Sequence, residues 1–165
     1  SCTNGDAIDS NGNVEISGGT VIANGPLSGV EEAVDFNGTF TMKGGLFIGA
    51  GSNSNMTKAM STTSTQANMY ISSSAQISSS TLLHIQDSAG KDLLTFKPKN
   101  GGYKFLFSSS SLSKGSSYSI YTGGSYSGGS SIGGLYSSGT YSSSGASLKK
   151  TVSLSSSTTV NTISF

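Results

Sequence analysis

Acidic side chains recur at a fixed spacing near the start of the chain. Asp6 and Asp9 return 26 residues later as Glu32 and Asp35. If the two segments stack as neighbouring strands, equivalent side chains lie about 4.8 Å apart. Two carboxylates about 5 Å apart repel by roughly 3 kcal/mol at an effective dielectric constant of about 20, and a cation between them reverses that repulsion. Because Ca²⁺ prefers oxygen ligands, we expect calcium as a cofactor. The expected ligands are Asp6, Asp9, Glu32 and Asp35, with Asn11 and Asn37 completing the set.

Each of these assignments has an alternative. The acids can instead fan outward into water and bind nothing. Asn11 and Asn37 each precede a glycine, and Asn-Gly suits a turn in the left-handed conformation. Their stacked amides can therefore form a structural ladder that satisfies the turn backbone.

The acids belong to a longer segment that occurs twice, at residues 6–23 and 32–49. Short apolar runs separated by Asn-Gly and Gly-Gly turns predict strands, and a period of this length indicates a repeat architecture. We predict an all-β chain in which residues 1–72 form a short right-handed parallel β-helix of about two to three coils. Val14 with Phe40, and Ile16 with Met42, should form inward stacks between coils.

The pattern changes in residues 73–165, which we expect to form a small antiparallel β-sheet or sandwich. The polar stretch 56–67 should cross the end of the coils. Glycines at 123–129 predict a flexible loop, and the Ser-rich stretch 108–147 has a disordered linker as its alternative. Strands are expected at 68–72, 81–85, 92–96, 103–108, 117–121, 148–154 and 158–165.

Composition excludes several classes of protein. Charged residues make up 10% of the 165 residues, and arginine is absent. Nucleic-acid readers depend on arginine contacts, so we expect no nucleic-acid partner. No apolar run is long enough for a transmembrane segment. Cys2 is the single cysteine, which excludes an internal disulfide and leaves a lipidated cysteine, an intermolecular disulfide or an incidental free thiol.

Five tyrosines in the Ser- and Gly-rich half are candidates for stacking on sugar rings, since the chain has no tryptophan. The same rings can instead serve sheet packing. The candidate carbohydrate-binding residues are Tyr118, Tyr121, Tyr126, Tyr136 and Tyr141.

Seven motifs follow one another along the chain: Gly5–Gly12, Ile16–Val21, Leu83–Gly90, Thr95–Pro98, Leu112–Gly115, Tyr121–Gly124 and Gly134–Ser137. In this order they resemble the last coils and the C-terminal region of a secreted bacterial family of parallel β-helix proteins. That family is described as carbohydrate-binding and calcium-binding, and is common in clostridia that degrade plant walls. The resemblance implies an extracellular or cell-surface location, bound calcium and a plant-type or acidic polysaccharide as partner.

Catalysis is not expected. His84 is the only histidine, and no spacing supports a triad or a zinc site. Pectate-lyase-type chemistry usually needs an arginine or lysine base, and glycoside hydrolysis needs two carboxylates across a groove. Two hypotheses stand: a non-catalytic polysaccharide-binding module, or a structural subunit of an extracellular filament. The filament would self-associate by strand pairing through its terminal coils or its C-terminal strand, Val160 to Phe165.

Overall fold

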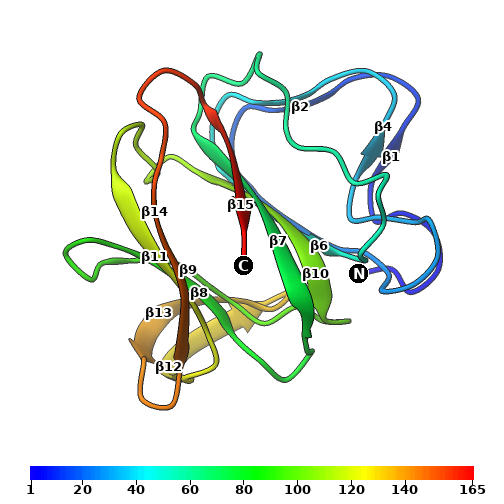
Figure 1. Cartoon of the computed structure of the whole chain (residues 1–165). Helices are drawn as coiled ribbons and strands as arrows, with labels where there is room; N and C mark the ends of the chain where they lie inside the picture. The colour runs from blue at the N-terminus through cyan, green and yellow to red at the C-terminus, as the bar shows by residue number, and fades with distance from the viewer.

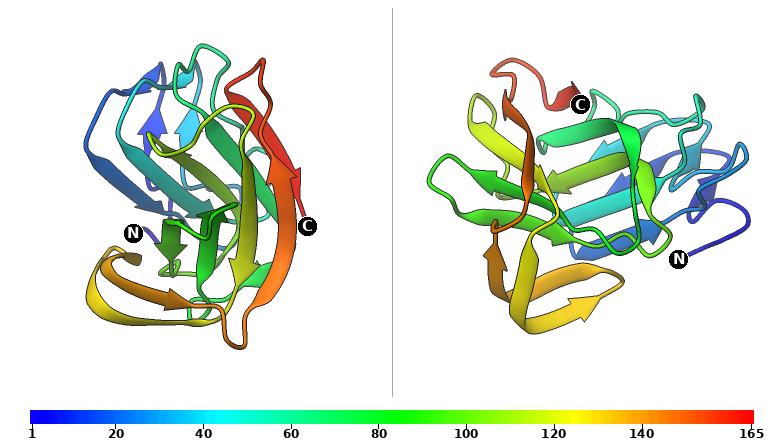
Figure 2. Two further views of the ribbon diagram at one scale, coloured as in Figure 1. Left: turned by 90° about the vertical axis from the view of Figure 1, so that its left-hand side faces the viewer. Right: turned by 60° about the horizontal axis from the view of Figure 1, so that its bottom comes forward.

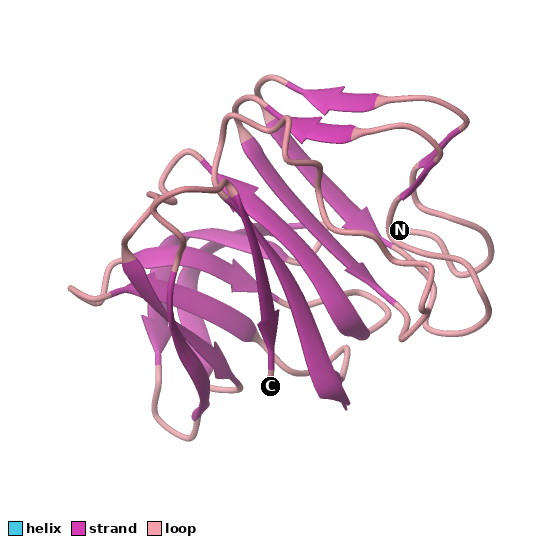
Figure 3. Cartoon of the chain, turned by 45° about the horizontal axis from the view of Figure 1, so that its top comes forward, coloured by secondary structure: helices cyan, strands magenta, loops and turns pink.

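The computed structural model describes residues 1–165 and contains only strands and loops (Figure 1, Figure 3). The predicted all-β class is confirmed. No helix of a length and apolar character sufficient to cross a membrane is present. The strands are β1 (Asp9–Ser10), β2 (Val14–Ile16), β3 (Thr20–Asn24), β4 (Asp35–Phe36), β5 (Phe40–Met42), β6 (Leu46–Gly51), β7 (Asn68–Ile77), β8 (Leu83–Asp87), β9 (Asp92–Phe96), β10 (Gly102–Ser109), β11 (Ser117–Thr122), β12 (Ser125–Ile132), β13 (Leu135–Ser142), β14 (Ser147–Ser153) and β15 (Val160–Ser164).

The two repeated segments form two stacked turns of chain, the first turn carrying β1, β2 and β3 and the second β4, β5 and β6. Equivalent strands pair in parallel, so that each residue lies opposite its counterpart 26 positions later, as with Asp9 and Asp35. Phe40 and Met42 are fully buried. Val14 lies opposite Phe40 and Ile16 opposite Met42, which confirms the predicted stacks.

These turns do not stand apart as a separate solenoid. On its far side β6 pairs with β10 in the antiparallel sense, and the resulting five-stranded sheet has the order β15-β7-β10-β6-β3. Both faces of β6 and β10 are covered, which explains why neighbouring residues of these strands are both buried. Phe47 points into the core inside the two turns, and Ile48 points into the core shared with the six-stranded sheet.

A loop covers the open edge of the second turn, as expected for residues 56–67. The N–H of Ser61 donates to the carbonyl oxygen of Phe40, and the N–H of Phe40 donates to Oγ of Ser61. The N–H of Met42 donates to Oγ of Ser64 in the same way. Serine hydroxyls thus satisfy the backbone of β5 where a third regular strand is missing.

The remaining strands form an antiparallel sheet of six, in the order β12-β13-β9-β8-β11-β14. Its central hairpin, β8–β9, matches the predicted strands at 81–85 and 92–96. The expected antiparallel sheet after the repeats is therefore present. It packs on one face of the five-stranded sheet around a core that includes Leu83, Ile85, Phe96, Phe105 and Phe107.

The prediction of a flexible loop at 123–129 is wrong. β12 begins at Ser125 and pairs with β13 along its length. Glycine serves geometry here rather than flexibility, since Gly129 has a φ of 64° and a Cβ on it would lie 2.1 Å from the carbonyl oxygen of Ser137. The Ser-rich stretch 108–147 is likewise built into strands β11, β12 and β13.

The expected boundary between residues 72 and 73 falls inside β7. Strands from both sides of it share the five-stranded sheet, because β10 and β15 pair with β7. The division into 1–72 and 73–165 stays an interpretation of the sequence pattern.

Candidate functional site

Three of the predicted metal ligands come together at the start of the two turns. Asp9 and Asp35 are direct neighbours in the β1–β4 pair, and Asp6 lies in the loop before β1. Their carboxylates offer oxygens that all lie within 4.8 Å of one another. The 26-residue register produces this proximity, because it places like residues of the two turns side by side.

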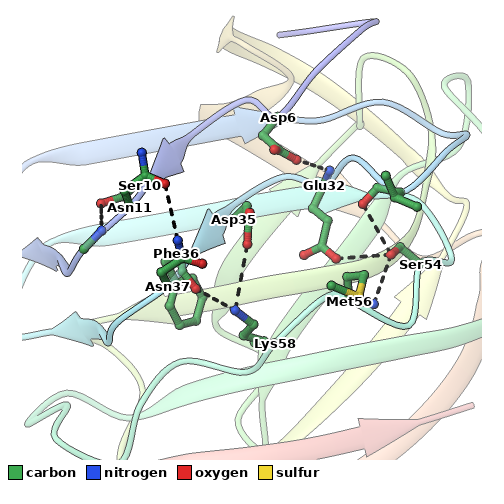
Figure 4. A network of polar contacts seen from close by, with 12 residues as sticks. Asp6, Ser10, Asn11, Glu32, Asp35, Phe36, Asn37, Ser54, Met56 and Lys58 are labelled. Atoms are coloured by element: carbon green, nitrogen blue, oxygen red, sulfur yellow. Dashed lines mark hydrogen bonds and ion pairs between the residues drawn. The ribbon is translucent and has the colours of Figure 1, made fainter.

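Glu32 is adjacent but differently oriented. Its backbone N–H donates to Oδ1 of Asp6, while its carboxylate accepts a hydrogen bond of 3.2 Å from the hydroxyl of Ser54 (Figure 4). The residue is only 2% exposed. Burial raises the pKa of Glu32, and the hydrogen bond from Ser54 opposes the rise.

Glu31 is a member of the cluster that the repeat did not reveal. Its counterpart in the first turn is Gly5, so it has no acidic equivalent 26 residues earlier. The nearby charge of Asp6 is the main cause that raises the pKa of Glu31. The sequence feature that could have identified Glu31 as part of the cluster is its position next to Glu32.

One cation lies beside the acids. Nζ of Lys58 is 3.9 Å from Oδ1 of Asp35 and donates a 2.6 Å hydrogen bond to the carbonyl oxygen of Phe36. It also lies 4.9 Å from the centre of the Phe36 ring. Lys58 pairs with Asp35 alone, and Nζ of Lys104 donates to the carbonyl oxygen of Ser54, so five carboxylates outnumber the nearby ammonium groups. The five are Asp6, Asp9, Glu31, Glu32 and Asp35.

The cluster opens into a hollow of about 280 Å³ lined by Asp6, Val30, Glu31, Glu32, Asp35 and Met56. Oxygen ligands lie about 2.3–2.6 Å from Ca²⁺, so ligand oxygens on opposite sides of the ion are about 5 Å apart. The separations among the three aspartates fit that requirement. All donors here are carboxylate oxygens, which suit a hard cation.

The two asparagines lie at the turn after β1 and β4. Nδ2 of Asn37 donates to Oδ1 of Asn11 at 3.3 Å. The amides therefore stack as a ladder between the turns, as the structural alternative anticipated.

The tyrosines occupy very different environments. Tyr118 is 3% exposed, and its hydroxyl accepts a hydrogen bond from the N–H of Ser113, so its ring is not at the surface. The hydroxyl of Tyr126 accepts from the N–H of Gly139 at 2.8 Å. The rings of Tyr126 and Tyr136 lie 4.9 Å apart.

Tyr136 is the candidate ring with a cation beside it. Nζ of Lys97 lies 5.7 Å from its centre. Tyr136 also lines the largest hollow of the molecule, about 550 Å³, which lies between the first-turn side of the five-stranded sheet and strands β9, β12 and β13. Its mainly apolar lining consists of Thr20, Ile22, Leu46, Leu93, Leu94, Thr95, Ile132, Leu135, Tyr136 and Ser137.

Tyr141 and Tyr121 flank the only histidine. The ring of Tyr141 stacks on His84 at 3.6 Å with 10° between the planes, and Tyr121 lies 6.2 Å away. His84 is fully buried, with Nδ1 at 2.8 Å from Oγ1 of Thr95 and Nε2 at 3.4 Å from Oδ1 of Asp92. Burial lowers the pKa of His84, while the Asp92 carboxylate opposes that change.

Comparison with protein-family models, with curated proteins and with solved structures gave no match in any of the three.

Proposed function

We propose that this chain is a non-catalytic extracellular module that binds acidic polysaccharide through a calcium ion. The observation that carries the proposal is the group of three carboxylates, Asp6, Asp9 and Asp35, whose oxygens lie within 4.8 Å of one another beside an open hollow. Calcium takes six to eight oxygen ligands, so positions remain for the carboxylates of a uronic-acid polymer.

Electrostatics supports a cation at this site. The carboxylates outnumber the nearby ammonium groups, and the pKa values of Glu31, beside Asp6, and of Glu32, which is buried, are both raised. The native cluster therefore binds more protons than the unfolded chain just above pH 4.5, the ordinary pKa of these groups. Repulsion in the fold then grows as the pH rises and the groups lose these protons. A divalent cation would remove that cost.

Further support comes from the fold and from the resemblance noted in the sequence. We interpret the two stacked turns as a short right-handed parallel β-helix, the fold that the resemblance implies. The acids lie on one side of these turns and are not paired across a groove, so the arrangement favours ion binding over hydrolysis.

Binding to immobilised polygalacturonate tests the proposal directly. The wild-type chain should be retained in calcium and released by a chelator, and it should not bind a neutral β-glucan. The double variant Asp9→Asn/Asp35→Asn should lose retention. Glu15→Gln, which alters an exposed acid paired with Lys43 outside the cluster, is the matched control and should behave as wild type.

Calcium should also raise the melting temperature, since it binds the native state alone. The rise should be larger at about pH 7 than at pH 4.5, because the ligands must be deprotonated. Equal retention and equal melting in calcium and in chelator would exclude the calcium-dependent module.

A second function is favoured by a separate observation on the sheet edges. β14, at one edge of the six-stranded sheet, carries Lys149 and Lys150 and a register shift. β12, at the other edge, is bent at Gly128 and Gly129. Such features block unwanted pairing. The edges of the five-stranded sheet, β3 and β15, carry no charge, proline or register shift.

We propose on this basis that the chain can also act as a structural subunit that assembles by strand pairing. Sedimentation of the wild-type chain at high concentration tests it. Assemblies larger than one chain are expected, and a strictly monomeric chain would remove this function while leaving polysaccharide binding untouched.

A further inference from the structure

The five-stranded sheet ends in two strands that run in the same direction. β3 is parallel to β6, β6 is antiparallel to β10, β10 is antiparallel to β7, and β7 is parallel to β15. β3 and β15 are therefore parallel to each other at opposite edges, and each has five residues. Placing two copies edge to edge by simple translation brings β15 of one beside β3 of the next.

The outward backbone groups of β3 are identified by its bonds to β6. The N–H of Leu46 donates to the carbonyl oxygen of Gly19, and the N–H of Gly25 donates to that of Ala50. Alternate residues of a strand point to the same neighbour, so the backbone groups of Thr20, Ile22 and Asn24 point outward. Only one end of this edge is occupied, where the N–H of Cys2 donates to the carbonyl oxygen of Asn24.

β15 presents the complementary row. The N–H of Asn68 donates to the carbonyl oxygen of Thr159, and the N–H of Phe165 donates to that of Ser72. The outward residues of β15 are therefore Val160, Thr162 and Ser164, and at one end of this row the N–H of Val160 already donates to Oγ1 of Thr158. No other strand pairs with this side of β15 or with the outer side of β3.

The two edges of the six-stranded sheet lie on the same sides of the molecule as the β3 and β15 edges. The β12–β13 hairpin curves beneath the first turn (Figure 2), and Nδ2 of Asn24 donates to the carbonyl oxygen of Gly133 at its tip. At the opposite side, Lys149 of β14 and Phe165 line one small hollow. The β3 edge thus lies above β12, and the β15 edge lies above β14.

Two of the four exposed large apolar side chains lie on these opposing edges. Ile132, at the end of β12, is 75% exposed, and Leu148 of β14 is 53% exposed. Ile132 also borders the apolar hollow beside Ile22. A copy seated against β3 would bring its β14 toward Ile132 and cover this apolar surface.

Charge argues against pairing of two β15 edges. That arrangement places Lys149 and Lys150 of one copy near the same lysines of the other, and like charges in contact are unfavourable. We infer that the β3 edge of one copy, with the hollow beside it, is the docking surface for β15 of a second copy. The contact is heterologous, so repetition produces an open chain of subunits. This inference rests on the proposed assembly function.

Two edge variants test this pairing. Ile22→Pro and Thr162→Pro each remove an outward N–H and leave the bonds within the sheet intact. Head-to-tail pairing predicts that each variant alone is monomeric by sedimentation. An equimolar mixture should form a complex of two chains and stop there, because one good β3 edge meets one good β15 edge. Thr20→Lys and Ser164→Lys, both at exposed positions, repeat the test without proline.

Each outcome has a definite meaning. Dimers of Thr162→Pro alone would indicate pairing of β3 with β3, and dimers of Ile22→Pro alone would indicate pairing of β15 with β15; either result overturns the inference. If both variants assembled as well as the wild type, the inferred β3–β15 contact would be overturned, while the assembly function would stand. A monomeric wild type would remove the assembly function itself. Circular dichroism of each variant, together with formation of the mixed complex, establishes that the variants are folded.

Discussion

His84 shows how a single residue is governed by its surroundings. It is stacked against Tyr141 and fully buried, and Thr95 and Asp92 contact its two nitrogens. Thr95 as donor to Nδ1, with the proton on Nε2 facing Oε1 of Gln86 and the Asp92 carboxylate, satisfies these contacts for a neutral ring. A lone histidine on a strand is therefore part of the packing here, and it attaches the β12–β13 hairpin to the outer face of β8.

This burial makes stability depend on pH. Because the pKa of His84 is lowered from 6.5, the unfolded chain binds more protons at this residue than the native chain below that pH. The stability that the native state gains from burying neutral His84 is fully present above pH 6.5 and is lost as the pH falls. We expect the melting temperature to fall more steeply in wild type than in His84→Gln between about pH 7 and pH 5. Parallel curves for the two proteins would contradict this.

Phe40 is the residue on which the stacking of the two turns most depends. It is fully buried and makes edge-to-face contacts with Phe36 at 5.8 Å and Phe47 at 5.0 Å. Phe40→Ala should lower the free energy of unfolding by about 3–5 kcal/mol, measured by urea denaturation. Phe165→Ala, at a partly exposed position, should cost clearly less. A loss below about 1 kcal/mol for Phe40→Ala would contradict its role as a core residue.

At the scale of the element, the repeat imposes different demands on its two copies. A Cβ on Gly44 would lie 2.6 Å from the carbonyl oxygen of Ser17 in the turn above. The equivalent Gly18 has nothing within 4 Å, because no turn lies above it. The same residue type is therefore required by packing in one turn and is free in the other.

These two glycines form a matched pair for mutation. Gly44→Ala should destabilise the protein by about 1–3 kcal/mol, since the backbones of the two turns must move apart. Gly18→Ala should change the stability of a single chain by less than about 0.5 kcal/mol. Thermal denaturation of dilute protein measures both, and equal effects would mean that the close stacking of the turns is not what constrains Gly44.

At the scale of the whole molecule, the two proposed activities depend on different forces. The acid cluster and a uronic-acid polymer interact through charge, which salt screens. The β3 and β15 edges are uncharged, and their pairing depends on backbone hydrogen bonds and apolar contact.

Raising the salt concentration from about 0.05 to about 0.5 M should separate the two activities. Polygalacturonate retention should weaken several-fold, while the sedimentation of assemblies should change little. Retention and sedimentation are measured on the same preparation. Repeating both measurements in potassium acetate controls for specific-ion effects. Assemblies that dissolve over this range would indicate a charged interface and would contradict pairing through β3 and β15.

The sequence alone determined the features that depend on local pattern and on the repeat. The 26-residue register placed Asp9 beside Asp35, Phe40 beneath Val14 and Asn37 beside Asn11, because similar segments stack most simply in phase. Alternating apolar residues likewise identified the β8–β9 hairpin. These predictions hold because strand period and turn chemistry act over a few residues.

Tertiary structure alone decided the features that join distant segments. β10 pairs with β6, β15 pairs with β7, and Tyr141 covers His84 across more than fifty residues, none of which leaves a periodic mark in the sequence. Glu31 joined the acids although its counterpart 26 residues earlier is Gly5, because the loop before β4 carries it to the same hollow. Glycines at 128 and 129 suggested flexibility, yet close approach to β13 requires Gly129, and a φ of 69° favours glycine at 128. Which strands form the sheet edges, which strands pair and which side chains are buried all depend on how complete sheets stack. That stacking depends on the whole chain at once.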